Sequence, residues 1–424
     1  MIEGKLAILG GPKIINYEFD SYNPIGLEEI NAAKKVLESG VLSKFLGSHG
    51  KEFYGGPKVR EFENLAADYF NVKHAVTFNS WTSGLIAGIG AFDIEPGDEV
   101  IVTPWTMCAS ATAIINWNAI PVFADIEPNT FCIAPSSVEK LITNKTKAIM
   151  SVDLFGQSAD IEALMRIAKK YNLKVLSDSA QAPGSKVNGK FTGTIADIGG
   201  YSLNYHKHIH TGEGGVLVTN NDLLAERSRL IRNHAEAVIG KHELDNLSNM
   251  IGYNFRMGEI EAAIGIEQLK KLEILVNKRS KAAEALSKGL KNLNGLQTPV
   301  IRNNCTHVYY IYPIILDLKF LNVKREKIFN ALVAEGIPGL RQGYTNLHLL
   351  PMYQQKQAYG SKNFPWSLSE NNINYSKGIC PNAENLQDNT FLGIEMCLND
   401  YSENDIQLMI KAFKKVWDNI DNLK

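Results

Sequence analysis

The chain alternates short apolar runs with longer stretches of helical periodicity, beginning at about residue 74. The apolar runs are rich in β-branched residues and lie at 74–78, 99–104, 120–125, 147–153, 173–178, 198–203 and 215–219. Short apolar runs alternating with helical stretches are typical of buried parallel strands joined by helical crossovers. We therefore predict an α/β fold: a three-layer sandwich with a mainly parallel (mixed) seven-stranded sheet and helices on both faces.

A long helical pattern separates this part of the chain from a second part. Residues 258–275 have helical periodicity, which continues to about 293. Beyond them come an alternating strand from Val308, a helix near 324–335, an irregular stretch near 340–385 and an amphipathic helix near 402–420. This order predicts a smaller α+β C-terminal domain.

A chain of 424 residues exceeds the usual size of one hydrophobic core, so we expect more than one domain. The predicted division has three parts. Residues 1–40 form an N-terminal segment that packs with the small domain and includes a helix near 26–39. Residues 41–275 form the large domain, which carries the candidate catalytic residues, and residues 276–424 form the small domain.

Composition and charge exclude several classes of protein. The 44 basic and 45 acidic residues form no long block of one sign, which argues against nucleic-acid or membrane partners. The N-terminal residues resemble no signal peptide, and no apolar run is long enough to span a bilayer, so a cytoplasmic location is expected. The five cysteines form no C-x-x-C pair, which predicts reduced thiols without a zinc site.

Two residues at strand ends carry candidate chemistry. Asp178 closes the run 173–178, and Lys207 lies in the loop after 198–203. Ligands of open α/β sheets bind beyond the carboxyl ends of the strands, where both residues fall. Pyridoxal phosphate (PLP) needs a lysine amine for its Schiff base and a carboxylate at its pyridinium nitrogen. Singly, such an aspartate often caps a helix and such a lysine is often solvated, but their order along the chain favours the cofactor.

Three further features bear on this site. Residues 79–85 lie between a strand and a helix and offer hydroxyls for a phosphate at a helix N-terminus, although a simple helix cap has the same pattern. Residues 212–215 are glycine-rich and are also compatible with a plain tight turn. His206, His208 and His210 flank Lys207; alternate residues of an extended loop point apart, so we predict no metal site. We expect these histidines to help lower the pKa of Lys207.

Together these residues resemble the sugar aminotransferases of the DegT/DnrJ/EryC1/StrS group, within the fold type I PLP enzymes. The resemblance spans nearly the whole chain and is most specific around Asp178 and Lys207. The matching segments are 57–63, 96–104, 121–126, 177–184, 202–215, 232–234 and 252–257.

The resemblance implies a role for each candidate residue. Lys207 would bind the PLP aldehyde and act as the base, and Asp178 would pair with the pyridinium nitrogen. Further cofactor contacts are implied for Gln181 at the ring, for Trp81, Thr82 and Ser202 at the phosphate, and for Asn254 from the neighbouring subunit of a homodimer. Some relatives replace the lysine by histidine and dehydrate their substrates. In the family the lysine lies five positions after the serine, and 202 + 5 gives Lys207, so transamination is expected.

The sequence departs from the family pattern at three places. Trp81 stands where glycine is usual, which predicts a different local backbone or pocket wall. The aromatic residue that usually covers the ring is replaced by Met107, so we expect either Met107 or Trp105 to cover it. Residues 44–56 look like an insertion near the active-site entrance.

These observations predict a PLP-dependent aminotransferase that moves an amino group from glutamate or glutamine to a ketone on a carbohydrate-type acceptor. The resemblance favours a nucleotide-linked keto-deoxysugar used in cell-surface polysaccharide or glycoside biosynthesis. Two alternatives are a cyclitol ketone and a small phosphorylated ketone anchored by Arg341, Arg60 or Lys44. A third, from another class, is a PLP-bound sensor without turnover.

Overall fold

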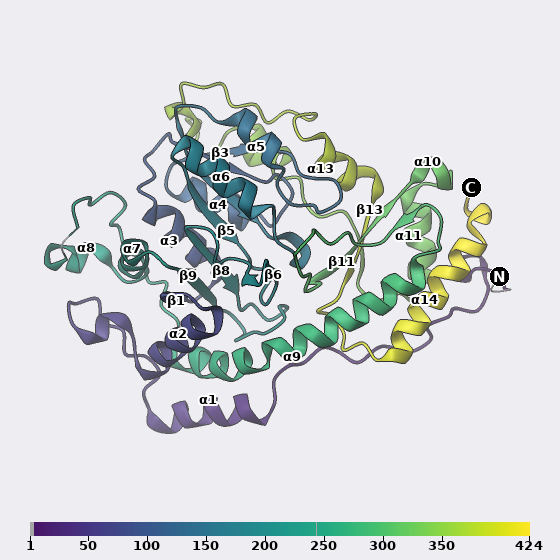
Figure 1. The fold of residues 1–424 in the computed structure, drawn as a ribbon, viewed down its shortest axis with the longest axis horizontal. Coiled ribbons are helices and arrows are strands. Elements are labelled where there is room, and N and C mark those ends of the chain that lie inside the picture. Colours follow the sequence, from purple (N-terminus) through teal and green to yellow (C-terminus); the bar gives the residue numbers. More distant parts are fainter. Residues whose placement is uncertain (1–3, 243) are drawn as a thin grey trace.

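The computed structural model describes residues 4–242 and 244–424 and contains a seven-stranded sheet, a four-stranded sheet and a two-stranded hairpin (Figure 1). The large sheet consists of β1 (His74–Phe78), β9 (Gly215–Thr219), β8 (Ile198–Ser202), β5 (Lys174–Asp178), β4 (Thr146–Val152), β2 (Glu99–Val102) and β3 (Ile120–Phe123), in that order across the sheet. Strand β9 is antiparallel to both neighbours, whereas the pairs from β8 to β3 are parallel.

Helices lie on both faces of this sheet, which gives the large part of the molecule three layers (Figure 1). The α-helices of the described residues are α1 (Leu27–Ser39), α2 (Pro57–Phe70), α3 (Trp81–Ala91), α4 (Ala109–Asn116), α5 (Pro135–Leu141), α6 (Ile161–Tyr171), α7 (Asp222–Arg232), α8 (Ala235–Val238), α9 (Glu259–Leu290), α10 (Leu318–Leu321), α11 (Arg325–Ala334), α12 (Pro351–Gln354), α13 (Pro381–Asn385) and α14 (Glu403–Asp418).

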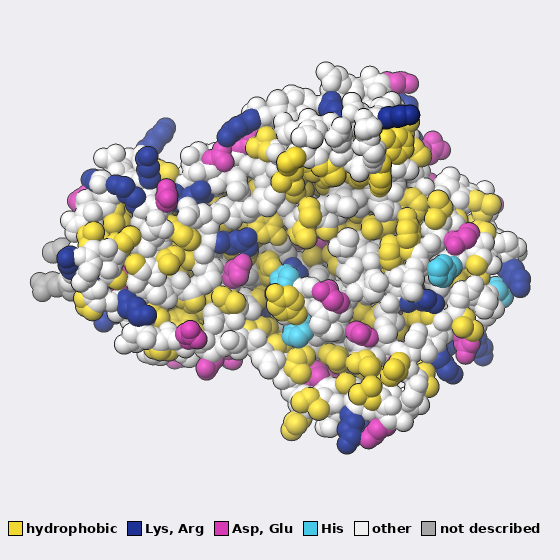
Figure 2. Space-filling view, turned by 180° about the vertical axis from the view of Figure 1, so that it is seen from behind, with side chains coloured by type: hydrophobic (Ala, Val, Ile, Leu, Met, Phe, Trp, Pro, Cys, Tyr) yellow, Lys and Arg dark blue, Asp and Glu magenta, His cyan; other side chains and the backbone are white. Residues whose placement is uncertain are grey.

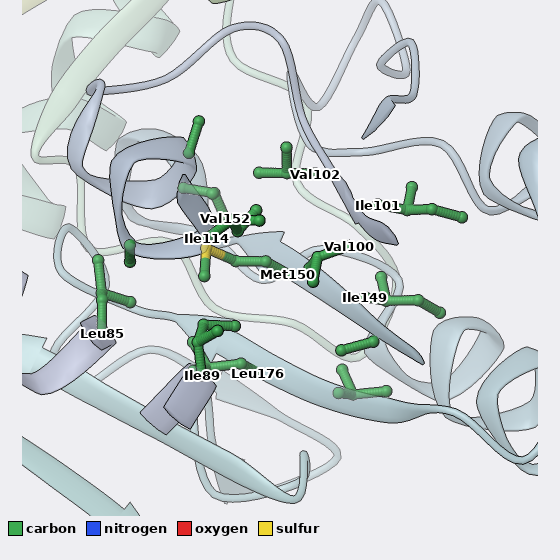
Figure 3. Packing of buried hydrophobic residues seen from close by; sticks show 14 of the residues in the cluster. Leu85, Ile89, Val100, Ile101, Val102, Ile114, Ile149, Met150, Val152 and Leu176 are labelled. Carbon is green, nitrogen blue, oxygen red and sulfur yellow. The ribbon is translucent and has the colours of Figure 1, made fainter. Parts of the chain in front are cut away.

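Successive residues of a strand face opposite layers, so both faces of the sheet are apolar. In β9, Val216 and Val218 pack in one cluster with residues of α2 and α9, whereas Leu217 packs in another with residues of α3. Figure 3 shows part of this second cluster, in which Ile89 of α3 lies beside Leu176 of β5. Burial on both faces explains why the strands read as continuous apolar runs.

Side-chain caps set several helix boundaries. At α14 the Ser402 hydroxyl accepts from the Asp405 N–H at 3.2 Å, while the Asp405 carboxylate accepts from the Ser402 N–H at 2.9 Å. At α6, Asp160 caps the first turn through the Ala163 N–H, and Asn172 ends the helix in the left-handed conformation. Local chemistry therefore determines where these helices begin and end.

Helix α9 connects the two parts of the molecule and is about 48 Å long at 1.5 Å per residue (Figure 1). Beyond it lies the four-stranded sheet β10 (Leu296–Gln297), β11 (Ile311–Leu316), β13 (Phe391–Glu395) and β12 (Leu340–Gln342), in that order across the sheet. This sheet shares a hydrophobic cluster with α11, α14 and the N-terminal residues Leu6, Ile15 and Phe19. It forms a smaller α+β unit.

The predicted fold class is confirmed, and all seven predicted strands of the large sheet form. The sequence did not predict β10, β12, β13 or the hairpin of β6 (Lys186–Val187) and β7 (Lys190–Phe191). The division into 1–40, 41–275 and 276–424 stays a prediction. Helix α9 crosses the 275/276 boundary without a break, and α1 packs against α9, where Glu29 binds Gln268 and Lys271.

Charged side chains are scattered over the face shown in Figure 2, without a large area of one sign. Among the residues that the structure describes, no helix is long and apolar enough to cross a membrane. All five cysteines are free thiols, and Cys108 is the exposed one.

Candidate active site

A cavity of about 200 Å³ opens at the carboxyl ends of the parallel strands β5 and β8. Asp178 ends β5 and Ser202 ends β8, and both line the cavity together with Lys207 from the following loop. Its other lining residues are Ser80, Trp81, Thr82, Leu85, Thr106, Met107, Ala109, Val152, Ala180, Gln181, Asn204, His206, Glu213, Tyr310 and Tyr344. The structure therefore brings the predicted acid and the predicted amine to one cavity.

The carboxylate of Asp178 is buried and accepts three hydrogen bonds. Its Oδ1 accepts from the Trp81 indole N–H at 2.7 Å and from the Ala180 N–H at 3.2 Å. Its Oδ2 accepts from the Ser110 hydroxyl at 2.8 Å. Burial raises the pKa of Asp178, whereas these donors and the charge of Lys207 lower it. The donors therefore favour the ionised form that a pyridinium partner requires.

The amine of Lys207 is nearly as well buried, because its side chain is only 7% exposed. Its Nζ lies 4.2 Å from the centroid of the Tyr310 ring, a cation–π distance. Burial lowers the pKa of Lys207 to about 8, with smaller opposing effects from Cys397 and Asp178. A considerable fraction of this amine is therefore neutral, and hence nucleophilic, near neutral pH.

This lowered pKa predicts the pH dependence with which the apo-protein captures an added aldehyde such as PLP. With a pKa of about 8, the neutral fraction rises from about a tenth at pH 7 to about nine tenths at pH 9. We expect the capture rate to rise roughly ninefold over this range and to level off above it, as measured by stopped-flow absorbance. An ordinary lysine would instead show roughly a hundredfold rise without levelling. Lys207→Ala is the control for capture by other lysines.

The three histidines near Lys207 point to different surroundings. His208 is fully buried, and its Nε2 lies 2.8 Å from the carbonyl oxygen of Val308. The backbone of His210 donates to Gln268, while His206 lines the cavity. Within residues 4–242 and 244–424, no group of three His, Cys, Asp or Glu side chains is placed to hold a metal.

The expected help of these histidines in lowering the pKa of Lys207 does not occur. Partial burial and the Lys207 charge lower the pKa of His206 to about 4. Burial holds the pKa of His208 well below its usual value. Both rings are therefore neutral near pH 7 and add no positive charge beside Lys207, so burial is the cause of its lowered pKa.

The predicted phosphate segment begins helix α3. Ser80 caps this helix, with its hydroxyl oxygen accepting from the Ser83 N–H at 3.1 Å, and Thr82 lines the cavity in the first turn. The first turn of a helix presents free N–H groups and a positive dipole end to an anion. The indole of Trp81 packs against Gly84 of α3 and Gly200 of β8, and its N–H donates to Asp178.

Gln181 is held in place by two hydrogen bonds. Its Oε1 accepts from the Phe155 N–H at 2.8 Å, and its Nε2 donates to the Tyr344 hydroxyl at 3.2 Å. Phe155 has a left-handed backbone with φ of 61°, which turns its N–H toward Gln181. Gln181 and Ser202 both line the cavity, as the resemblance implies.

The two candidates for covering the ring lie in different places. Met107 lines the cavity and is 55% exposed, so its thioether is free to move over a bound ring. Trp105 is fully buried among Phe131, Phe155 and Phe391, and its indole N–H donates to Gln387 at 2.9 Å. The alternative in which Trp105 covers the ring is therefore wrong, because this side chain is fixed in an aromatic cluster.

Asn254 and the predicted insertion lie away from the cavity lining. Asn254 is exposed, and its side-chain oxygen accepts from Arg256 at 2.7 Å. Residues 44–56 form a loop held by Asn233, whose side chain donates to the carbonyls of Leu46 and Phe53. A role for either in the site requires a second subunit.

The sequence did not reveal three residues of the site. Ser110 binds Asp178, Tyr310 covers Lys207, and Tyr344 binds Gln181. Ser110 follows a strand end and was in principle recognisable as a hydroxyl at the active edge of the sheet. Tyr310 and Tyr344 come from the smaller part of the chain and approach the site only through tertiary packing.

These residues fit PLP. An aldehyde needs a nucleophilic amine, which Lys207 supplies, and a pyridinium nitrogen needs a carboxylate, which Asp178 supplies. A phosphate needs hydrogen-bond donors, which the N-terminus of α3 and the hydroxyls of Thr82 and Ser202 supply. All four residues line the same cavity. One subunit therefore supplies an amine, a carboxylate and hydroxyls that suit the three parts of the cofactor.

Comparisons with known proteins agree with this site. The chain matches the model of the DegT/DnrJ/EryC1/StrS aminotransferase family over residues 27–383. It is 36% identical to GDP-perosamine synthase of Caulobacter vibrioides over 299 residues, 70% of this chain and 79% of that protein. It is 31% identical to L-glutamine:scyllo-inosose aminotransferase of Streptomyces griseus over 341 residues, 79% of this chain and 80% of that protein.

The solved structure of Helicobacter pylori PseC, an aminotransferase involved in the biosynthesis of pseudoaminic acid, has the same fold. It superposes with a TM-score of 0.76 at 28% identity and covers 95% of this chain and 100% of its own. The family match spans most of the chain, and the cavity contains the residues that the cofactor needs. The chain therefore belongs to the DegT/DnrJ/EryC1/StrS aminotransferase family and is a PLP-dependent aminotransferase.

Proposed function

We propose that the protein transfers an amino group from glutamate or glutamine to the ketone of a nucleotide-linked deoxysugar. The observation that carries the proposal is the cavity in which a buried amine of lowered pKa, Lys207, and a buried carboxylate, Asp178, lie together beside the start of α3. The bound cofactor supplies an electron-withdrawing ring that stabilises negative charge on the substrate carbon. The protein supplies binding, orientation and proton transfer.

Lys207 has two roles in this proposal. Its neutral amine would hold the cofactor through its aldehyde, and once the amine of the substrate has taken its place it would move the proton at the substrate carbon. Tyr310 lies over the amine and restricts its access to water. Asp178 would accept a hydrogen bond from the pyridinium nitrogen and keep the ring cationic, and Gln181 and Met107, which line the same cavity, would lie at the ring.

Thr82, Ser202 and the first turn of α3 hold the phosphate in this proposal. Asn254 completes the phosphate site from a neighbouring subunit, so the active unit is a homodimer. The exposure of Asn254, of Met107 at the cavity and of Tyr205 beside His206 supports this arrangement, because a second copy would cover them.

The nature of the acceptor is supported by the relatives. GDP-perosamine synthase is named for a nucleotide-linked amino sugar, and the relative from Helicobacter pylori for a step in making pseudoaminic acid. The relative from Streptomyces griseus is named for glutamine as donor and for a cyclitol ketone as acceptor. A cyclitol ketone is therefore the second candidate acceptor.

A small phosphorylated ketone finds less support. Arg341, one of the three proposed anchors, stacks over Tyr344 at 5.0 Å and is already paired with Glu395 at 3.1 Å. Lys44 lies within 4.0 Å of Glu52 in the loop 44–56. Each would have to leave an acidic partner to bind a phosphate.

An acceptor screen tests the proposal. The loaded enzyme is incubated with glutamate or glutamine and one of three acceptor classes: nucleotide-linked keto-deoxysugars, cyclitol ketones or keto-phosphates, with donor consumption as readout. We expect the highest kcat/KM for a nucleotide-linked keto-deoxysugar. Turnover restricted to α-keto acids would contradict a carbohydrate acceptor. A cofactor absorption band that glutamate and glutamine leave unchanged would favour a PLP-bound sensor instead.

A further inference from the structure

Trp81 occupies a slot between helix α3 and the large sheet. Its side chain is 4% exposed. The slot exists because two neighbouring residues lack side chains: a Cβ on Gly200 of β8 would lie 2.1 Å from the indole, and a Cβ on Gly84 of α3 would lie 2.6 Å from it. Any larger residue at either position would displace the ring. The chain therefore holds this indole in one orientation.

That orientation directs the indole N–H at Asp178. A carboxylate offers about four acceptor positions in its plane. Trp81 and the Ala180 N–H occupy the two on Oδ1, and the Ser110 hydroxyl occupies one on Oδ2. One position on Oδ2 is left, and Asp178 lines the cavity. A ring nitrogen that donates from the cavity would complete the set.

We propose that Trp81 is a positioning residue whose indole N–H, together with the Ser110 hydroxyl, keeps Asp178 ionised and turned so that its free acceptor position meets the pyridinium nitrogen. This inference rests on the proposed function, in which Asp178 binds the cofactor ring. Trp81, which replaces the usual glycine, would therefore act at the ring nitrogen of the cofactor. The first turn of α3, which Trp81 begins, would act at the phosphate.

The physical reason is the burial of the carboxylate. Removal from water disfavours the charged form of Asp178, and each donor to that form opposes the effect. Without the indole N–H, the equilibrium of the Asp178 carboxyl shifts from the ionised form toward the neutral acid. A carboxylate accepts a hydrogen bond from a protonated ring nitrogen. A neutral acid instead donates one to an unprotonated ring nitrogen. Lys207, Asp153 and Tyr344 are the titratable groups that interact electrostatically with Asp178, and none of them replaces this hydrogen bond.

The experiment compares Trp81→Phe with Trp117→Phe in the enzyme loaded with PLP. Trp117 is a matched control because it is also 4% exposed, and its indole N–H also donates over 2.7 Å, to the carbonyl of Ile86. It also packs closely against a glycine, Gly90. Three quantities are measured: the dissociation constant of PLP by equilibrium dialysis, the single-turnover rate with glutamate, and the pH profile of that rate.

Loss of one hydrogen bond to a charged group corresponds to roughly 10- to 100-fold. We expect Trp81→Phe to weaken PLP binding and slow the single turnover by about that factor. The acidic limb of the pH profile should move to higher pH, because removal of the donor raises the pKa of the carboxyl. Trp117→Phe should change each quantity by less than about twofold. Equal effects of the two substitutions would overturn the inference.

Ser110→Ala supplies the second test. It removes the other side-chain donor with little change in volume, and we expect the same directions of change. If Trp81→Phe does not fold, an unshifted acidic limb and an unchanged PLP dissociation constant in Ser110→Ala overturn the inference. A wild-type protein that binds PLP but does not respond to glutamate or glutamine contradicts the proposed function instead. The PLP dissociation constants of the variants then still decide the role of Trp81.

Discussion

Lys207→Ala is expected to lower kcat/KM for transamination by at least about 10³-fold, because it removes both the amine that binds the aldehyde and the base that moves the proton. The fold should persist. The lowered pKa of Lys207 shows that burial of its charged form is unfavourable for folding. The substitution removes this unfavourable charge, which offsets the loss of the side chain's packing. Steady-state kinetics with the best acceptor of the screen, together with circular dichroism and thermal unfolding, measure the two effects.

Lys207→Arg is the control that separates charge from nucleophilicity. Arginine keeps a positive charge beside Asp178 and Tyr310 but stays protonated and does not bind an aldehyde. We expect it to be as inactive as Lys207→Ala. Near wild-type turnover in either variant would refute the assignment of this residue as the reactive amine.

Asp178→Asn is expected to slow the reaction between about 10²- and 10³-fold, the range seen when one preorganised electrostatic group is removed. Asparagine keeps the shape of the side chain. Its oxygen can accept from the Trp81 indole and the Ala180 N–H, and its amide can donate to the Ser110 hydroxyl. Its remaining N–H then faces the cavity as a donor, which leaves the ring nitrogen unprotonated and the ring a weaker electron acceptor.

The same substitution should leave stability unchanged or increase it, because burial already raises the pKa of Asp178 and asparagine carries no charge to bury. Thermal unfolding of the apo-protein measures this. Asp125→Asn is a matched control: Asp125 is 8% exposed, lies just beyond β3 and accepts from the N–H groups of Asn382 and Ala383. Activity in Asp178→Asn equal to that in Asp125→Asn would contradict the role of Asp178 at the ring.

The large sheet was predictable because each of its strands can be recognised from a short segment of the sequence. Each strand is buried on both faces, so it appears as an apolar run such as 74–78 or 215–219, and the structure has strands at these positions. Strands β12 and β13 were not predictable in the same way. They lie near a long irregular stretch, and the pairing of β13 with β12 and with β11 joins residues far apart in the chain.

The same contrast holds within the site. Asp178 and Ser202 end neighbouring parallel strands, and Lys207 follows the second, so the rule that ligands bind at carboxyl strand ends was enough to group them. Tyr310 and Tyr344 come from the smaller part of the chain, and Ser110 comes from a separate helix. Their positions depend on how the elements pack. The pKa of Lys207 also depends on tertiary packing. Burial of the amine lowers this pKa, whereas the histidines beside Lys207 in the sequence do not contribute.

The sequence by itself determined the fold class and the order of the strands along the chain, and it predicted the amine and the acid, because strand periodicity and strand-end chemistry are properties of short segments. Only the tertiary structure decided that Trp81 points at Asp178, that Trp105 is buried among aromatic rings and that Tyr310 covers Lys207. The direction of a side chain depends on the space its neighbours leave. At Trp81 that space exists because Gly84 and Gly200, far apart in the sequence, meet beneath one indole.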